Sequence, residues 1–316
     1  MEELKTVALR GCIFIGSIIL RDGLTEIGEG TFYKCHNLET IVIPKTITKI
    51  GPEAFAHSGL KSITLLDGRL TEIGEAAFYE CHNLKTVIMP DSVTKVGPYA
   101  FTSSGLKSIT LPGGRLTEIE RDVFFKCRNL ETVIIPETVT KIGRYAFANS
   151  GLKSIILPQG LTEIGNDAFN DCRNLETVVI PKTVTKIDTE TFAFSGLKSI
   201  TLSHGLTEIV EGAFYKCGNL ESVVIPETVT KIGEGAFSHS GLKSITLLDG
   251  GLTEIGVVVF IRCRNLETIV IPKTVTKIGP GAFAESGLKS ITLPYEVEIG
   301  ENAFCNCHDL VVNHRN

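Results

Sequence analysis

Apolar side chains recur along this chain at an almost constant interval. A phenylalanine returns every 22 or 23 residues, with one final gap of 21, so that thirteen repeats can be counted. The recurring residues are Phe32, Phe55, Phe78, Phe101, Phe124, Phe147, Phe169, Phe192, Phe214, Phe237, Phe260, Phe283 and Phe304. Within the first repeat, Ile41 and Ile43 alternate with Thr40 and Val42, which is the period-two pattern of a strand with one buried face.

Each repeat is therefore predicted to contain one short strand, as at residues 38–43, 60–65 and 288–293. Pro44 ends the first of these strands because proline has no N–H to donate. One repeat cannot bury its apolar side alone, so the repeats are expected to stack, with parallel strands about 4.8 Å apart.

This pattern predicts three segments. Residues 1–23 are expected to form a degenerate first coil, because Ser17–Leu20 matches the later strand Ser62–Leu65. Residues 24–310 are expected to form the solenoid of about 13 coils, and residues 311–316 a C-terminal tail. Val311 and Val312 begin a strand that stops, and an open strand edge favours pairing with another chain, so a monomer or an end-to-end dimer is expected.

The repeat resembles the BspA-type leucine-rich repeats. The motif Ala-Phe-x-x-Cys/Ser-x-x-Leu-x-Ser/Thr-Ile/Val-x-Ile-Pro-x-x-Val-Thr-x-Ile-Gly is most complete at residues 213–233, and the resemblance covers about residues 24–310. It implies a leucine-rich-repeat solenoid: a right-handed superhelix with one parallel β-sheet on its concave face and an irregular or short-helical convex side. It also implies a surface protein that binds proteins of a host or a neighbouring cell, and it brings no catalytic motif.

The true period is two coils. Coils with Cys-x-Asn-Leu-Glu-Thr, as at 127–132, alternate with coils with Ser-Gly-Leu-Lys-Ser, as at 150–154. The residue before the last Ile or Val of each coil alternates in sign without exception from Glu26 and Lys49 to Lys277 and Glu298. Stacked coils would place these charges about 5 Å apart, so alternation replaces repulsion by attraction worth about 0.2–1 kcal/mol per exposed pair.

A second charge row follows the first strand leucine and breaks once. Lys85 stands where alternation calls for an acid, so that Lys61, Lys85 and Lys107 adjoin. The break is either neutral drift or a local site for an anion or an acidic partner.

Nine cysteines could indicate disulfides or a metal site. Seven of them follow the repeat phenylalanine by three residues and recur in every second coil, namely Cys35, Cys81, Cys127, Cys172, Cys217, Cys263 and Cys307. Neighbours in this row would lie about 9.6 Å apart, beyond the Cα separation of about 7 Å that a disulfide tolerates, so buried thiols are expected. Cys305, Cys307, His308 and His314 could form a zinc cluster, but their spacing matches no standard zinc signature.

Composition and charge count against several classes of function. The net charge of −5 lacks the clustered Lys and Arg that nucleic-acid binding requires. No apolar run reaches the roughly 20 residues of a membrane span, so no membrane insertion is expected. No phosphate loop or catalytic constellation is evident, and the sequence predicts neither an enzyme nor a cofactor.

The remaining candidate for a functional surface is the outward face of the predicted strands. It is either a solvated sheet or a contact strip for a protein partner. The candidate binding residues, including the three lysines, are Thr40, Val42, Thr86, Ile88, Thr132, Ile134, Ile156, Val179, Val224, Val270, Lys61, Lys85 and Lys107. Two functions stay open: an adhesin-like surface module, which the family resemblance favours, and an intracellular interaction scaffold, which the unpaired thiols and the lack of a visible signal peptide favour. The compartment is cell surface or secreted by resemblance alone.

Overall fold

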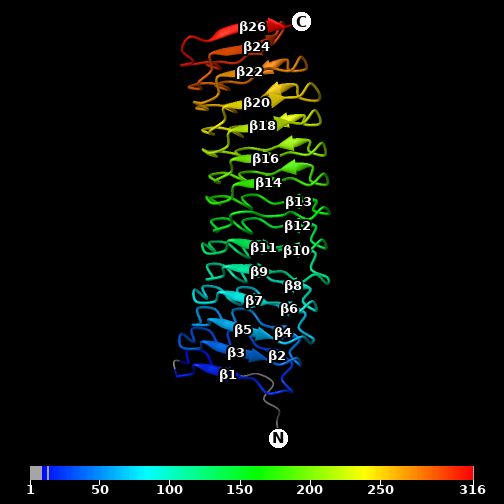
Figure 1. The fold of residues 1–316 in the computed structure, drawn as a ribbon, viewed down its shortest axis with the longest axis vertical. Coiled ribbons are helices and arrows are strands. Elements are labelled where there is room, and N and C mark those ends of the chain that lie inside the picture. The colour runs from blue at the N-terminus through cyan, green and yellow to red at the C-terminus, as the bar shows by residue number, and fades with distance from the viewer. Residues whose placement is uncertain (1–8, 13, 316) are drawn as a thin grey trace. The chain divides into compact units, whose positions relative to one another are not determined.

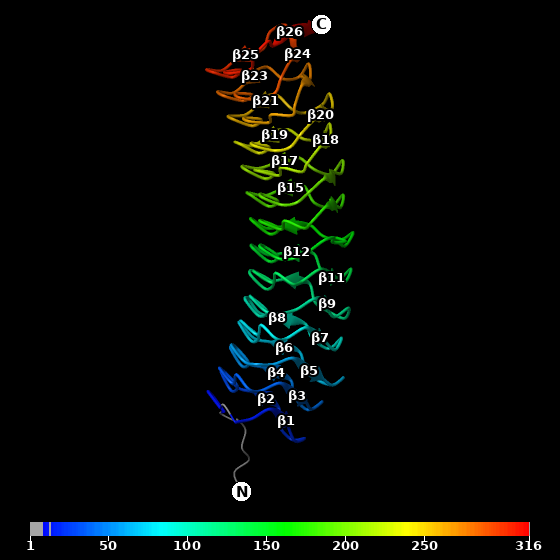
Figure 2. The ribbon, with the colours of Figure 1, turned by 60° about the vertical axis from the view of Figure 1, so that its left-hand side comes forward.

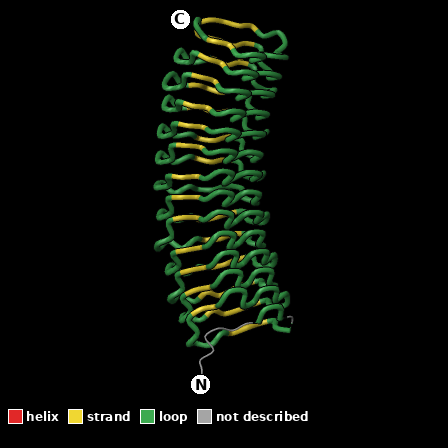
Figure 3. The backbone as a smooth tube through the Cα atoms, turned by 180° about the vertical axis from the view of Figure 1, so that it is seen from behind, coloured by secondary structure: helices red, strands yellow, loops and turns green. Residues whose placement is uncertain are grey.

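The computed structural model describes residues 9–12 and 14–315, and the chain forms two compact units, residues 1–160 and 161–316. Each unit is a stack of similar coils (Figure 1). Nearly every coil contributes one strand of three to five residues and one strand of two residues, and the described residues contain no helix (Figure 3).

In the first unit the longer strands form one parallel sheet in the order β1-β3-β5-β7-β9-β11. Their bounds are β1 Ser17–Ile19, β3 Thr40–Ile43, β5 Ser62–Leu65, β7 Thr86–Ile88, β9 Ser108–Thr110 and β11 Thr132–Ile134. The two-residue strands are β2 Glu26–Ile27, β4 Lys49–Ile50, β6 Glu72–Ile73, β8 Lys95–Val96, β10 Glu118–Ile119 and β12 Lys141–Ile142. Of these, β2-β4-β6-β8 form a second parallel sheet and β10 pairs with β12.

The second unit repeats this plan. Its longer strands are β14 Thr177–Val179, β16 Ser199–Thr201, β18 Ser222–Ile225, β20 Ser244–Leu247, β22 Thr268–Val270, β24 Ser290–Pro294 and β26 Val311–Arg315. Its short strands are β13 Glu163–Ile164, β15 Lys186–Ile187, β17 Glu208–Ile209, β19 Lys231–Ile232, β21 Glu254–Ile255, β23 Lys277–Ile278 and β25 Glu298–Ile299. The strand expected to stop at Val312 continues to Arg315 and pairs with β24 over five residues.

The leucine-rich-repeat solenoid class is confirmed, and the side away from the longer strands is largely irregular, which is one of the two expected alternatives. It carries the rows of short strands and no helix among the described residues (Figure 2). In the turns between them, alternate N–H groups donate to the next coil: Glu53 to the Glu75 carbonyl and Phe55 to the Ala77 carbonyl, both at 2.8 Å. Glu53 has a positive φ of 50°. Such a residue cannot continue a right-handed helix, and the bonds between coils satisfy the backbone instead.

The core of each unit is a ladder of phenylalanine rings. Twelve of the thirteen repeat phenylalanines are fully buried, from Phe32 to Phe283. Neighbouring rings stack nearly parallel, for example Phe78 on Phe101 with centroids 5.1 Å apart and planes 7° apart. The coil-to-coil repeat therefore sets the ring separation within the 4.5–7 Å range that favours aromatic pairs.

The two-coil period has a steric cause as well as an electrostatic one. In the shorter Ser-Gly corners the glycine lies directly on a backbone carbonyl of the preceding Cys corner. A Cβ built on Gly105 would lie 2.0 Å from the His82 carbonyl oxygen, and one on Gly59 would lie 1.9 Å from the His36 carbonyl oxygen. No side chain fits at these positions, so two long corners of the Cys-x-Asn type cannot follow one another without a change in this packing.

Gly105→Ala is expected to lower the free energy of unfolding by about 3 kcal/mol, because the obstructing atoms are backbone and cannot rotate away. Gly113→Ala is the matched control: the nearest atom to its Cβ is Asp91 Oδ1 at 3.9 Å, and its stability should change by less than about 0.5 kcal/mol. Urea unfolding followed by circular dichroism measures both. Equal stabilities for the two variants would contradict the close corner packing.

Candidate functional site

A row of aliphatic side chains faces solvent on the longer strands. In the first unit Ile156, which lies outside the assigned strands, is 84% exposed. On the strands themselves Ile88 and Ile134 are 80% and 62% exposed, whereas Val87 and Val133 are buried. Strand alternation turns successive side chains to opposite faces, which directs these residues outward. In the second unit Val179, Val224 and Val270 are at least half exposed.

The remaining outward residues predicted from the sequence occupy the same faces. Thr40, Thr86 and Thr132 are exposed, and Val42 is half-buried. The register aligns Val42 with Thr64, Ile88 with Thr110, and Thr110 with Ile134. The first unit therefore brings Val42, Ile88 and Ile134 into one row, with threonines between them.

The exposed row of the first unit is hollowed over β7, β9 and β11. A groove of about 670 Å³ lies there, lined by Ile88, Thr110 and Ile134 together with Met89 and Pro136. At one end of the groove, Asp91 Oδ1 accepts a hydrogen bond of 3.1 Å from the Gly113 N–H. The groove is thus mostly apolar, with hydroxyl side chains among its lining and an acidic residue at that end.

The second charge row lies at the start of the longer strands. Five lysines of this row form ion pairs of 2.6–2.9 Å with the glutamate of the preceding coil. The pairs are Lys61 with Glu39, Lys153 with Glu131, Lys198 with Glu176, Lys243 with Glu221 and Lys289 with Glu267. These exposed pairs hold the coils in register at little energetic gain each.

The break in this row leaves two lysines without such a pair. Lys107 donates its backbone N–H to the Lys85 carbonyl at 3.0 Å, so the two residues are direct neighbours. Within residues 9–12 and 14–315, neither side chain forms an ion pair. Lys61, which was predicted to adjoin these two lysines, forms an ion pair with Glu39, with Nζ and Oε1 2.7 Å apart. The pKa of Glu131, next to Lys107, is lowered by Lys153 first and by Lys107 to a smaller extent.

A second hollow adjoins the same coils beyond these lysines. It has a volume of about 320 Å³ and is lined by His82, Lys126, Arg128 and Asn129. Lys126 and Arg128 were not predicted as site residues. For Arg128 the sequence offered one signal. The position directly after each cysteine of the repeat row holds His82 in one coil and Arg128 two coils later.

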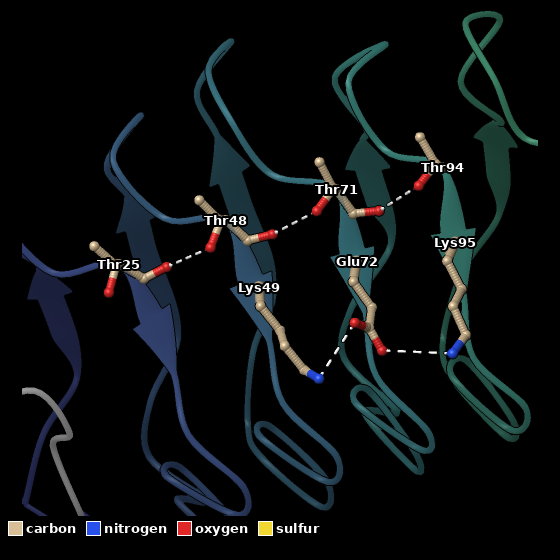
Figure 4. A network of polar contacts seen from close by, with 7 residues as sticks. All are labelled: Thr25, Thr48, Lys49, Thr71, Glu72, Thr94 and Lys95. Carbon is tan, nitrogen blue, oxygen red and sulfur yellow. Dashed lines mark hydrogen bonds and ion pairs between the residues drawn. The ribbon is translucent and has the colours of Figure 1, made fainter.

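The carboxylates of the first charge row are used in stacking. Figure 4 shows Glu72 between two lysines, with Lys49 Nζ at 3.2 Å and Lys95 Nζ at 3.6 Å from its carboxylate oxygens. Lys49 pairs in register with both Glu26 and Glu72, as the alternating sequence predicts. These groups are partners of each other, which gives them a structural role in stacking the coils.

Threonines reinforce the same edge. The hydroxyl of Thr48 donates to the Thr25 carbonyl at 3.0 Å, Thr71 to Thr48 at 3.1 Å, and Thr94 to Thr71 at 3.2 Å (Figure 4). Each hydroxyl thus bridges to the coil before it. The Thr-Glu-Ile and Thr-Lys-Ile segments therefore join neighbouring coils through both backbone and side chains.

All nine cysteines are free thiols, and six of the seven in the repeat row are buried as predicted. Cys81 Sγ donates to the Phe55 carbonyl at 3.0 Å and lies 3.4 Å from Ser58 Oγ. Burial raises the pKa of Cys81 and Cys217 to about 12 and that of Cys127 and Cys263 to about 11. Such thiols stay protonated at neutral pH and are poor nucleophiles.

The structure does not assemble the zinc cluster considered at the C-terminus. Throughout the described part of the chain, no three side chains of His, Cys, Asp or Glu are grouped so as to hold a metal ion. Cys307 Sγ donates to the Phe283 carbonyl at 3.1 Å, and His314 stacks on Tyr295 with centroids 5.3 Å apart. Of the described residues, none belongs to a helix long and apolar enough to cross a bilayer.

Comparison with known proteins identifies the family of this repeat. The sequence profile of the BspA type leucine-rich repeat region (6 copies) matches residues 2–131, 117–243 and 187–311. No curated protein matches the chain significantly in sequence.

Solved structures show the same fold. A leucine-rich repeat protein from Bacteroides ovatus is similar with a TM-score of 0.71 and 29% identity, over 96% of this chain and 74% of that one. A leucine rich cell surface protein from Faecalibacterium prausnitzii has a TM-score of 0.59 and 28% identity, over 95% and 88%. The pneumococcal vaccine antigen PcpA, at 18% identity, has a TM-score of 0.58 over 98% of this chain and 86% of its own, and shows the fold alone.

Proposed function

The chain belongs to the BspA-type leucine-rich repeat family, and from this membership we propose that it is a non-enzymatic protein-binding module of a cell surface. It acts as an adhesin that contacts proteins of a host or of a neighbouring cell through the exposed face of its longer strands. The similarity to the cell surface protein of Faecalibacterium prausnitzii supports the location.

One observation carries this proposal: the exposed aliphatic side chains on the longer strands, together with Ile156 in the coil after β11 and β12. Water disfavours Ile88, Ile134 and Ile156 at such exposure, and no described part of the first unit covers them. Exposed apolar patches often mark interaction sites, and the strand face of a repeat stack is a common place for them.

The double substitution Ile134→Asp with Ile156→Asp tests the proposal. Labelled full-length chain is added to intact epithelial cells and to intact bacterial cells of other species, and bound label is measured by flow cytometry. The variant is expected to bind at least about tenfold more weakly, because the partner would have to bury two carboxylates.

Asn174→Asp with Asn219→Asp is the matched control, since it adds the same two charges at exposed corner positions outside the longer strands. It should bind like the wild type. Binding that survives the isoleucine substitutions, or a wild-type chain that binds neither kind of cell, contradicts the proposal.

The alternative function is an intracellular interaction scaffold, and the nine free thiols favour it. Proteins of oxidising compartments more often pair their cysteines, whereas cytosolic proteins keep them reduced. Biotinylation of living cells with a membrane-impermeant reagent separates the two. Label on the chain supports the surface module, and its absence beside a labelled surface marker supports the scaffold.

A further inference from the structure

The first unit contains a surface that differs from all the repeats around it, and three features meet there. Lys85 and Lys107 adjoin without an ion pair, the apolar groove over β7, β9 and β11 begins beside them, and the hollow with Lys126 and Arg128 lies on their other side.

From these features, and resting on the proposed function, we propose that this surface binds an extended acidic segment of the partner protein. An acidic side chain of the segment pairs with Lys85 and Lys107, and an aliphatic side chain three positions away enters the groove between Ile88 and Ile134.

Charge is the first argument. In the equivalent coils of both units, each glutamate of this row neutralises the lysine of the next coil. Lys85 replaces that glutamate, so two ammonium groups are left for an external carboxylate. Lys126 and Arg128 extend the positive potential in a chain whose net charge is −5. Complementary charge selects and orients a partner more than it adds affinity.

Geometry is the second argument. Lys85 directly precedes β7 and lies three residues before Ile88, the last residue of that strand, which corresponds to about 10 Å at about 3.3 Å per residue. A partner segment in the extended polyproline II conformation rises about 3.1 Å per residue with three residues per turn, so an acidic and an aliphatic side chain three positions apart point to the same side and match this spacing. Asp91, whose Oδ1 accepts the hydrogen bond from the Gly113 N–H at the far end of the groove, repels an acidic residue of the partner segment there. This repulsion fixes the direction in which the segment binds.

The proposal is tested with a phage-displayed library of random peptides panned against the immobilised full chain. Enriched peptides are then synthesised, and their affinity is measured by fluorescence anisotropy at low and at physiological ionic strength. The expected peptides carry Asp or Glu three positions from Leu, Ile or Val, and they bind more weakly as salt rises.

Lys85→Glu restores the alternating row and should leave the fold intact, yet it is expected to weaken these peptides at least about tenfold. Lys243→Glu, the same change in the same row of the second unit, is the control and should alter affinity less than about twofold.

Enriched peptides without an excess of acidic residues, or peptides that bind Lys85→Glu as tightly as wild type, overturn this inference. If such peptides still lose affinity for Ile134→Asp with Ile156→Asp, the strand face binds proteins and only its acidic selectivity is wrong. A library that yields no binder contradicts both proposals.

Discussion

Phe124→Ala is expected to lower the free energy of unfolding by about 4 kcal/mol, the largest loss from any single truncation considered for this chain. Phe124 is fully buried and stacks between Phe101 at 5.8 Å and Phe147 at 5.3 Å. Removing its ring leaves a cavity and breaks two aromatic contacts at once. Urea unfolding followed by circular dichroism measures the loss, since the chain has no tryptophan to report it by fluorescence.

The neighbouring residue supplies the control. Phe125 is only half-buried, and it packs at the surface against Tyr145 with centroids 6.1 Å apart. Phe125→Ala removes the same atoms one residue away and should cost about 1 kcal/mol. A similar loss for both substitutions would show that the ring ladder is not the principal source of stability.

Alkaline pH is expected to destabilise the fold by about 5 kcal/mol between pH 8 and pH 10, beyond the effect of its other titrating groups. The folded state holds the pKa of Cys81, Cys127, Cys217 and Cys263 at about 11 to 12, above the ordinary value of 9.0, because burial disfavours the thiolate. Above pH 9 the unfolded chain releases these protons and the folded chain keeps them. The unfolded state then binds fewer protons, so stability falls as pH rises.

Single substitutions resolve the contribution of one thiol. Cys81→Ala should reduce the drop between pH 8 and pH 10 by about 1 kcal/mol, whereas Cys305→Ala, which removes an exposed thiol, should leave it unchanged. Urea midpoints at the two pH values under reducing conditions measure this difference. An identical pH dependence for wild type and Cys81→Ala would contradict a buried, protonated thiol at this position.

The longer strands could be predicted from the sequence because one rule decides them. Alternation of buried Ile41 and Ile43 with outward Thr40 and Val42, ended by Pro44, leaves a single way to stack the coils. The short strands could not be predicted in the same way, because Lys49–Ile50 is too short to show a period. They form because stacking has already aligned them with Glu26–Ile27 and Glu72–Ile73.

The candidate site was predictable only in part. The outward positions follow from the strand pattern, and the break at Lys85 is visible in the sequence. The sequence could not show that Lys61 turns to Glu39, because a flexible lysine can reach either neighbouring coil. The groove depends on the spacing of neighbouring coils, and the hollow at Arg128 depends on the conformation of the loop backbone. Neither feature leaves a periodic signal in the sequence.

Engineered cross-links test the central claim most directly, which is that neighbouring coils stack in register and present these strand residues on one face. Thr110 and Ile134 are register partners about 4.8 Å apart, within the reach of a disulfide, whereas Ile88 and Ile134 lie two coils and about 9.6 Å apart. In a background with Cys12→Ser and Cys305→Ser, mild oxidation should link Thr110→Cys to Ile134→Cys, as read by mass spectrometry of proteolytic fragments. The pair Ile88→Cys and Ile134→Cys should stay reduced, and a link in that pair without one in the first would contradict the stacked register.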